Sequence, residues 1–97
     1  MSLRGNPVAE SATLPDGRIV RIDVRILEDP YIEERSETVT VELHADDGEV
    51  RASVATVLEP EQTSEARGLA REIRAGLESG ELEPTAGAIE PLGDVPR

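Results

Sequence analysis

Apolar and polar residues alternate strongly along the segment Thr38–Leu58, TVTVELHADDGEVRASVATVL. From Val39 to Ala45 every second residue is apolar, and the residues between them are polar. Because successive side chains of a strand point to opposite faces, this spacing predicts a strand with one apolar face. Asp47-Gly48 favours a two-residue type I′ turn, in which both central residues need a positive φ. The segment therefore predicts a β-hairpin.

The predicted turn also sets the register of this hairpin. It places Ala45 opposite Val50 and His44 opposite Arg51, and the apolar pairs further along share one face.

The second face of the hairpin is expected to be solvated near the turn and drier at the far end, where Ala55 and Val57 lie. We expect the C-terminal segment or a partner chain to cover this drier end.

The segment Arg18–Leu27, RIVRIDVRIL, shows the same alternation and predicts a half-buried strand. Its apolar face consists of Val20, Ile22, Val24 and Ile26, and its polar face of Arg21, Asp23 and Arg25. Residues 15–17, Pro-Asp-Gly, predict a turn before it, because proline presets φ and glycine supplies a positive φ. We expect Val8–Leu14 to form a first strand that pairs with Arg18–Leu27, although its alternation is poorer.

Apolar residues follow a helical spacing over residues 60–79. They recur at i, i+3, i+4, i+7 and i+11, which predicts the buried stripe of an amphipathic helix: Ala66, Leu69, Ala70, Ile73 and Leu77. Pro60 and Glu61 suit a first helical turn, and Gly80 fits the left-handed position that closes a helix.

Two glycines interrupt this helix on the side away from the apolar stripe. Gly68 and Gly76 lie along one line with Glu72, and each glycine costs about 1 kcal/mol relative to alanine in a helix. Either the glycines are tolerated without a role, or another element approaches the helix closely there. A partner subunit and the C-terminal segment are the two candidates.

The last segment, residues 81–97, contains three prolines and two glycines, which predicts an extended, irregular tail. Its apolar residues are spaced like anchors of a strap: Leu82, Ile89, Leu92 and Val95. The tail is expected to cross the sheet, to dock in a partner's groove, or to be a frayed terminus.

Together these elements predict an α+β fold. An antiparallel meander sheet of three to four strands is packed on one face by a single C-terminal amphipathic helix, which an irregular Pro/Gly tail follows. The length of 97 residues indicates one domain over 1–97, with the sheet in 8–58, the helix in 60–79 and the extended tail in 81–97.

Composition limits the possible partners. The formal net charge of −11 disfavours nucleic acid and anionic membranes as partners. Aromatic residues make up 1% of the chain, so the core must be aliphatic. We recognise no signal peptide and no apolar run of membrane-spanning length, and the chain has no cysteine. We therefore expect a cytoplasmic protein.

No residue pattern predicts a catalytic, metal or cofactor site. His44 is the single histidine, and we interpret it as a surface residue in a polar cross-strand cluster. The acids around Gly48 do not follow the spacing of a calcium-binding loop.

The leading hypothesis is therefore a non-enzymatic protein–protein interaction or regulatory module that self-associates as a homodimer or binds another protein. Its expected interaction surface comprises Tyr31, Ile32, Ala55, Val57, Gly68, Glu72 and Gly76. Two alternatives stay open. One is an acidic inhibitor, antitoxin or nucleic-acid mimic that binds a basic partner, and the other is a small enzyme that uses carboxylates and His44.

Overall fold

A computed structural model describes residues 3, 7–28 and 37–96 of the chain. Its elements are β1 (Val8–Thr13), β2 (Ile19–Glu28), β3 (Glu37–Ala45), β4 (Val50–Ala55), α1 (Thr63–Ser79) and α2 (Ala86–Gly93). The strands form one antiparallel sheet in the order β1-β2-β3-β4. The predicted α+β class and antiparallel meander are confirmed, with four strands.

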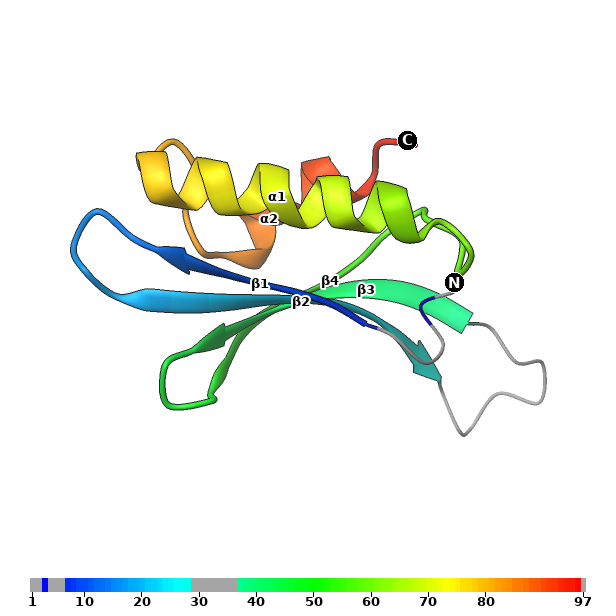
Figure 1. Ribbon diagram of the computed structural model, residues 1–97, viewed down its shortest axis with the longest axis horizontal. Coiled ribbons are helices and arrows are strands. Elements are labelled where there is room, and N and C mark those ends of the chain that lie inside the picture. The colour runs from blue at the N-terminus through cyan, green and yellow to red at the C-terminus, as the bar shows by residue number, and fades with distance from the viewer. Residues whose placement is uncertain (1–2, 4–6, 29–36, 97) are drawn as a thin grey trace.

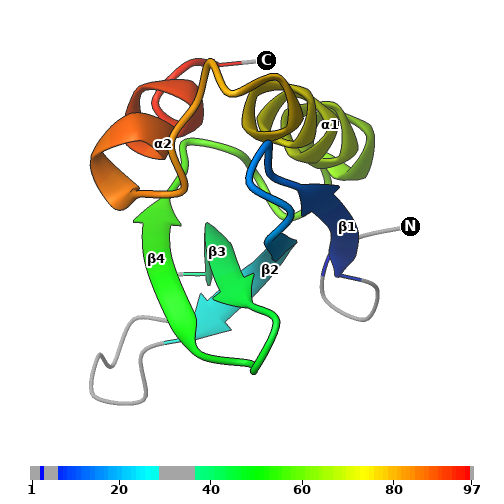
Figure 2. The ribbon, with the colours of Figure 1, turned by 90° about the vertical axis from the view of Figure 1, so that its left-hand side faces the viewer.

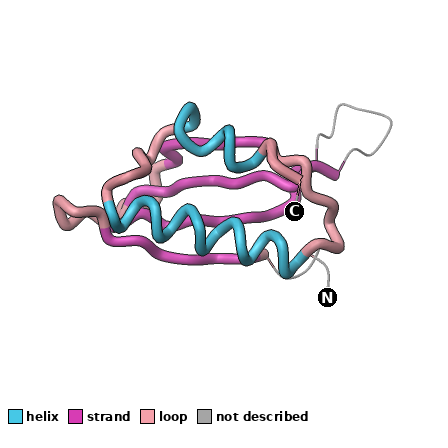
Figure 3. Tube along the Cα trace, turned by 90° about the horizontal axis from the view of Figure 1, so that it is seen from above, coloured by secondary structure: helices cyan, strands magenta, loops and turns pink. Residues whose placement is uncertain are grey.

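Both helices lie on the same side of the sheet (Figure 1). Helix α1 contacts β1 and β2, whereas α2 contacts β4, so each helix covers one flank of the sheet (Figure 2). Seen from above, the two helices lie over opposite margins with strands visible between them (Figure 3). The other face of the sheet is not covered by any element that the structure describes, and we call it the open face.

An aliphatic core fills the space between the sheet and the helices. The largest fully buried side chains come from β2 and β3 and from both helices: Ile22, Leu43, Leu69, Ile73, Leu77, Ile89, Val20, Val24, Val39 and Val41. The predicted apolar stripe of α1 is buried along its whole length. Burying each large aliphatic side chain contributes about 2 kcal/mol before the entropy cost.

The loop between β1 and β2 is a three-residue turn built as its Pro-Asp-Gly sequence predicts. The Leu14 N–H donates to the Arg18 carbonyl at 2.8 Å, and the Gly17 N–H donates to the Leu14 carbonyl at 2.9 Å. Gly17 has a φ of 92°, the left-handed value that glycine adopts without strain.

The loop between β3 and β4 has the same form, and the predicted two-residue type I′ turn is wrong. The Gly48 N–H donates to the Ala45 carbonyl at 2.9 Å, and the Ala45 N–H donates to the Glu49 carbonyl at 2.8 Å. Among the described residues only glycines have a positive φ. A type I′ turn would force Asp47 into that region, whereas the three-residue loop requires it of Gly48 alone.

A β-bulge then corrects the register. His44 lies opposite Val50 but Leu43 lies opposite Ala52, which leaves Arg51 as an extra residue in β4. The two pairs predicted next to the turn are therefore wrong. Because the longer loop and the bulge each shift the register by one residue in compensating directions, the pairs predicted further from the turn are observed.

Helix α1 begins at Thr63, three residues later than predicted. The Pro60 carbonyl accepts a hydrogen bond from the N–H of Leu3 at 2.9 Å, so it bonds to the N-terminal segment and not to a helical N–H. The predicted end is confirmed, because Gly80 closes the helix with a φ of 81°.

The prediction of a single helix followed by an extended tail is wrong, because residues 86–93 form α2. The Thr85 hydroxyl accepts a hydrogen bond from the N–H of Ala88 at 3.3 Å and caps the helix. Ile89 is fully buried and anchors α2 in the core. Pro91 removes one helical donor, but α2 ends two residues later, so the loss is confined to its last turn.

The two α1 glycines differ in what surrounds them, and this difference predicts opposite effects on stability. A methyl group at Gly76 would lie 2.9 Å from the Cβ of Leu82, whereas one at Gly68 would have no neighbour within 4 Å. Gly68→Ala should raise the free energy of unfolding by about 0.5–1 kcal/mol, because alanine favours the helix. Gly76→Ala should lower it by about 1 kcal/mol through overpacking. Urea unfolding followed by circular dichroism checks both variants, and stabilisation by Gly76→Ala would contradict the contact.

The contacts of Asp16 in the first hairpin loop should make the stability of the protein depend on pH. The Asp16 carboxylate accepts hydrogen bonds from the backbone N–H of Arg18 at 3.0 Å and from its Nε at 2.6 Å, and these contacts lower the pKa of Asp16. A lowered folded-state pKa stabilises the protein above the unfolded value and loses that effect as the pH falls. Asp16→Asn keeps a side-chain oxygen that can accept these hydrogen bonds, but it removes the carboxyl group that titrates. Between about pH 5 and about pH 3, the wild type should therefore lose more thermal stability than the variant. Parallel losses would contradict this assignment.

Candidate interaction surfaces

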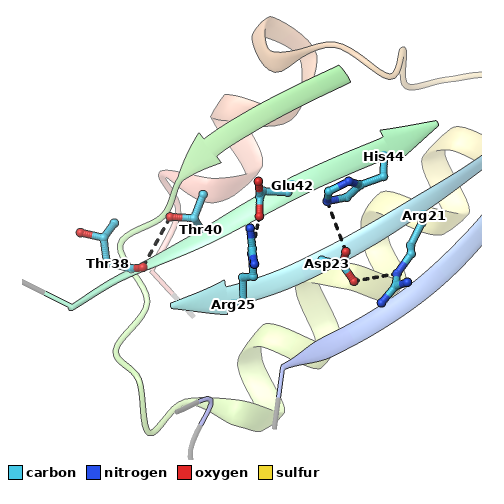
Figure 4. Close-up of polar contacts among 7 residues, drawn as sticks. All are labelled: Arg21, Asp23, Arg25, Thr38, Thr40, Glu42 and His44. Carbon is cyan, nitrogen blue, oxygen red and sulfur yellow. Dashed lines mark hydrogen bonds and ion pairs between the residues drawn. The ribbon is translucent and has the colours of Figure 1, made fainter. Parts of the chain in front are cut away.

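A cluster of charged side chains lies at the centre of the open face, and Figure 4 shows it. The open-face cluster consists of Arg21, Asp23 and Arg25 from β2 with Glu42 and His44 from β3. Asp23 joins its two neighbours, since one carboxylate oxygen lies 3.0 Å from Arg21 Nε and the other 3.3 Å from His44 Nε2. The predicted polar environment of His44 is observed, but its partners lie on β2 and not across the β3–β4 hairpin.

The second ion pair of the cluster has a buried carboxylate, Glu42, and a half-exposed arginine, Arg25. The Nε of Arg25 donates a hydrogen bond to the Glu42 carboxylate, and this bond raises the pKa of Arg25, which stays charged. Glu42 is 6% exposed and its neighbour on β3, Thr40, is 4% exposed. The Thr40 hydroxyl donates to the Thr38 carbonyl at 3.4 Å. The middle of the open face is therefore drier than the sequence predicted.

Exposed apolar residues lie at both ends of this cluster. Ile19 and Val50 flank its hairpin end and are 46% and 51% exposed, and Val57 follows β4 at the other end with 50% exposure. Within the cluster, two arginines face two carboxylates. The open face thus combines an internally neutralised centre with exposed β-branched residues.

The cluster does not assemble a nucleophile with a base among the residues that the structure describes. A shallow hollow of ≈ 350 Å³ beside it is lined in part by Ser11, Asp23 and His44. Ser11 and His44 are separated by β2, hence by about 10 Å at the usual strand spacing. Ser53 lies opposite Glu42, without a hydrogen bond between the two side chains in the described structure. The arrangement can bind polar groups, but within residues 7–28 and 37–96 no hydroxyl is hydrogen-bonded to the imidazole.

The β1 edge of the sheet is occupied by side chains of α1. The N–H of Thr13 donates to the Glu78 carboxylate at 3.4 Å. The Glu10 carboxylate lies 3.3 Å from Arg74 Nη1 and 3.8 Å from Arg71 Nε. These contacts give the Thr13 N–H a hydrogen-bond partner and place charged side chains along this edge. Both effects disfavour pairing with another strand.

Both ends of the β4 edge are poorly suited to pairing with another strand. At the end near α2, the Gly93 carbonyl accepts a hydrogen bond from the N–H of Val57 at 3.1 Å. A methyl group at Gly93 would lie 3.3 Å from the Ala55 carbonyl oxygen, so α2 approaches the strand backbone closely. The bulge at Arg51 distorts the other end. Only a short stretch around Ser53 keeps a regular open edge, so an interface by strand addition is not favoured.

A second surface lies on the helix side of the sheet. Glu72 and Gly76 of α1 line a groove of ≈ 500 Å³ together with Leu82 and Leu92, and we call it the α1–α2 groove. Leu82 packs against Gly76, so the close approach considered for the helix glycines occurs at Gly76 and is made by the C-terminal segment. At Gly68 no such approach is seen in the described structure.

The remaining predicted interaction residues have different positions. Ala55 and Val57 lie at the β4 end of the open face, both exposed, and the C-terminal segment contacts their backbone without covering their side chains. Tyr31 and Ile32 lie outside the described residues.

Sequence reasoning missed the link from Asp23 to His44 and the groove lined by Leu82 and Leu92. Thr85, a strong helix-capping residue placed just before an apolar stretch, was the available signal for α2 and hence for the groove. No local signal marked the Asp23 contact, because it depends on the pairing of β2 with β3.

A comparison of the chain with protein-family models, with curated proteins and with solved structures returned no significant match. Over the described residues, neither helix has the length and apolar character needed to cross a membrane.

The Arg25–Glu42 ion pair, in which the carboxylate is buried and the arginine is half exposed, predicts unequal costs for removing its two partners. Arg25→Ala strands a carboxylate on Glu42, which is 6% exposed, so the free energy of unfolding should fall by about 2–3 kcal/mol. Glu42→Gln releases Arg25, whose side chain is 47% exposed and can be hydrated, so the cost should be about 1 kcal/mol. Urea unfolding at neutral pH measures both.

Arg21→Ala is the matched control, since this arginine lies on the same strand face but its side chain is 63% exposed. Its effect should be smaller than that of Arg25→Ala. Equal losses for the two arginine variants would show that the burial of Glu42 does not govern the stability of the cluster.

Proposed function

We propose that this protein is a non-enzymatic protein–protein interaction module that self-associates through the open face of its sheet. The observation that supports the proposal is the charge balance of that face. Arg21 and Arg25 are paired with Asp23 and Glu42 within a chain of formal net charge −11.

Electrostatics selects this face over the others. Two copies of a strongly acidic chain repel each other, and desolvating unpaired carboxylates at an interface is costly. A surface whose charges are already paired can approach its own copy without bringing like charges into contact. The open-face cluster meets this requirement, because each of its carboxylates has a cationic or hydrogen-bonding neighbour on the adjacent strand.

The apolar residues around the cluster supply the favourable free energy of association. Ile19, Val50 and Val57 are each about half exposed, and Ala55 lies beside Val57 at the β4 end. Burying such side chains against a second copy removes apolar area from water, at about 25 cal/mol per Å². Apolar contacts combined with hydrogen-bonded polar groups are a common composition of protein interfaces.

Self-association predicts that one valine on the open face is essential and that an equally exposed valine elsewhere is not. Val50 and Val95 are 51% and 52% exposed, and Val95 lies two residues after the end of α2, in the C-terminal segment that Figure 1 shows on the helix side of the sheet. Val50→Glu should weaken the dimer at least about tenfold, because it buries an unpaired charge, whereas Val95→Glu should change it less than about twofold. Sedimentation equilibrium of the full chain measures the dissociation constants, with circular dichroism as the check of folding.

Salt gives a second readout for the same interface. Raising the ionic strength should tighten the wild-type dimer, because it screens the repulsion between two copies. A strict monomer at a concentration of about 100 μM, or equal weakening by Val50→Glu and Val95→Glu, would refute the proposed interface.

A further inference from the structure

An Asp-Gly dipeptide lies in each of the two hairpin loops, Asp16-Gly17 between β1 and β2 and Asp47-Gly48 between β3 and β4, and both are exposed to solvent. Such dipeptides are chemically labile, because glycine lets its own backbone nitrogen approach the preceding carboxyl group closely. Attack of this nitrogen on the aspartyl Cγ forms a C–N bond, expels one carboxyl oxygen as water and gives a five-membered succinimide. Water then opens either carbonyl of the ring, which yields aspartate or isoaspartate.

The two loops hold their dipeptides in matching backbone geometry. The φ angle is 92° at Gly17 and 89° at Gly48. Each glycine N–H donates to the carbonyl of the residue three positions earlier, at 2.9 Å in both loops. One carboxylate oxygen of each aspartate accepts a hydrogen bond from the backbone N–H two positions later, at 3.0 Å in both loops. The backbone therefore gives the glycine nitrogen similar access to the carboxyl group in the two loops.

The loops differ in the side chain that follows the glycine, which is Arg18 in the first loop and Glu49 in the second. The Nε of Arg18 lies 2.6 Å from the second carboxylate oxygen of Asp16. Among the residues that the structure describes, no cation pairs with Asp47. Succinimide formation uses the neutral carboxyl group, because a carboxylate is a poor electrophile. The backbone N–H and the guanidinium of Arg18 hold the pKa of Asp16 below its usual value, so its neutral form is rarer.

We infer that Asp47-Gly48 is a site of isoaspartate formation in the folded protein and that the Arg18 side chain protects the equivalent Asp16. The main-chain linkage moves from the α-carboxyl to the β-carboxyl of Asp47, which lengthens the loop backbone by one methylene group. The water released in the first step is returned in the second, so the mass of the chain is unchanged. This inference goes beyond the proposed self-association, since it concerns a covalent modification of the chain itself.

A reciprocal exchange of the two flanking residues tests the inference. Full-length wild type, Glu49→Arg and Arg18→Glu are incubated in the folded state at about pH 5, where a fraction of the carboxyl groups is protonated. Peptide mapping by liquid chromatography and electron-transfer mass spectrometry quantifies isoaspartate in both loops of each protein. Circular dichroism checks that each protein stays folded, and the unchanged loop of each variant is the internal control.

In the folded wild type, isoaspartate should form at Asp47 at least about threefold faster than at Asp16, because only Asp16 has a cationic partner. Glu49→Arg should slow the reaction at Asp47 by about threefold, and Arg18→Glu should accelerate it at Asp16 by a similar factor. In urea, where the loop contacts are lost, the two wild-type rates should agree within about twofold.

Equal rates in the two loops of the folded wild type, or a faster rate at Asp16, would overturn the inference. An unchanged rate at Asp47 in Glu49→Arg or at Asp16 in Arg18→Glu would also overturn it, because the flanking arginine would then not be the protecting group. A difference that persists in urea would assign the lability to local sequence, and isoaspartate that forms only in urea would show that the folded loops block the reaction. Both results contradict the inference, whereas the self-association is tested separately by Val50→Glu.

Discussion

The burial of one aliphatic sheet face beneath two helices is the interaction on which this structure depends. With aromatics at 1% of the chain, valine, leucine, isoleucine and alanine must fill the core. One helix is too narrow to cover four strands spaced about 4.8 Å apart, so α1 covers β1 and β2 and α2 is needed over β4. Ile89 completes the core from α2. The second helix is therefore part of the minimal fold.

This arrangement also determines which surfaces remain accessible. Helix α1 supplies Glu78 to the β1 edge, and α2 places Gly93 against the end of β4. Pairing of another strand with either edge of the sheet is therefore disfavoured. The open face stays uncovered by the described elements. The division of the two helices over opposite margins leaves the α1–α2 groove between them. Two surfaces with different chemistry result from one packing solution.

The difference between these surfaces is electrostatic. On the open face, Arg21 pairs with Asp23 along β2, and Arg25 of β2 pairs with the buried Glu42 of β3. After α1, the chain carries acids without a basic residue until its last position. A charge-balanced face suits association with an identical acidic chain.

Periodicity along the chain determined the strands, the buried stripe of α1 and the glycine that ends it, because these features depend on residues close in sequence. The three-residue loop and the bulge at Arg51 escaped prediction, because the bulge compensates for the longer loop and leaves the alternation intact. Pro91 inside helix α2 and the prolines on either side of it disfavoured a helix prediction, and the helix is stabilised by the burial of Ile89, a contact with distant parts of the chain. Only the tertiary structure brought Asp23 to His44 and Leu82 to Gly76, since strand pairing and helix packing, not local sequence, decide which side chains meet.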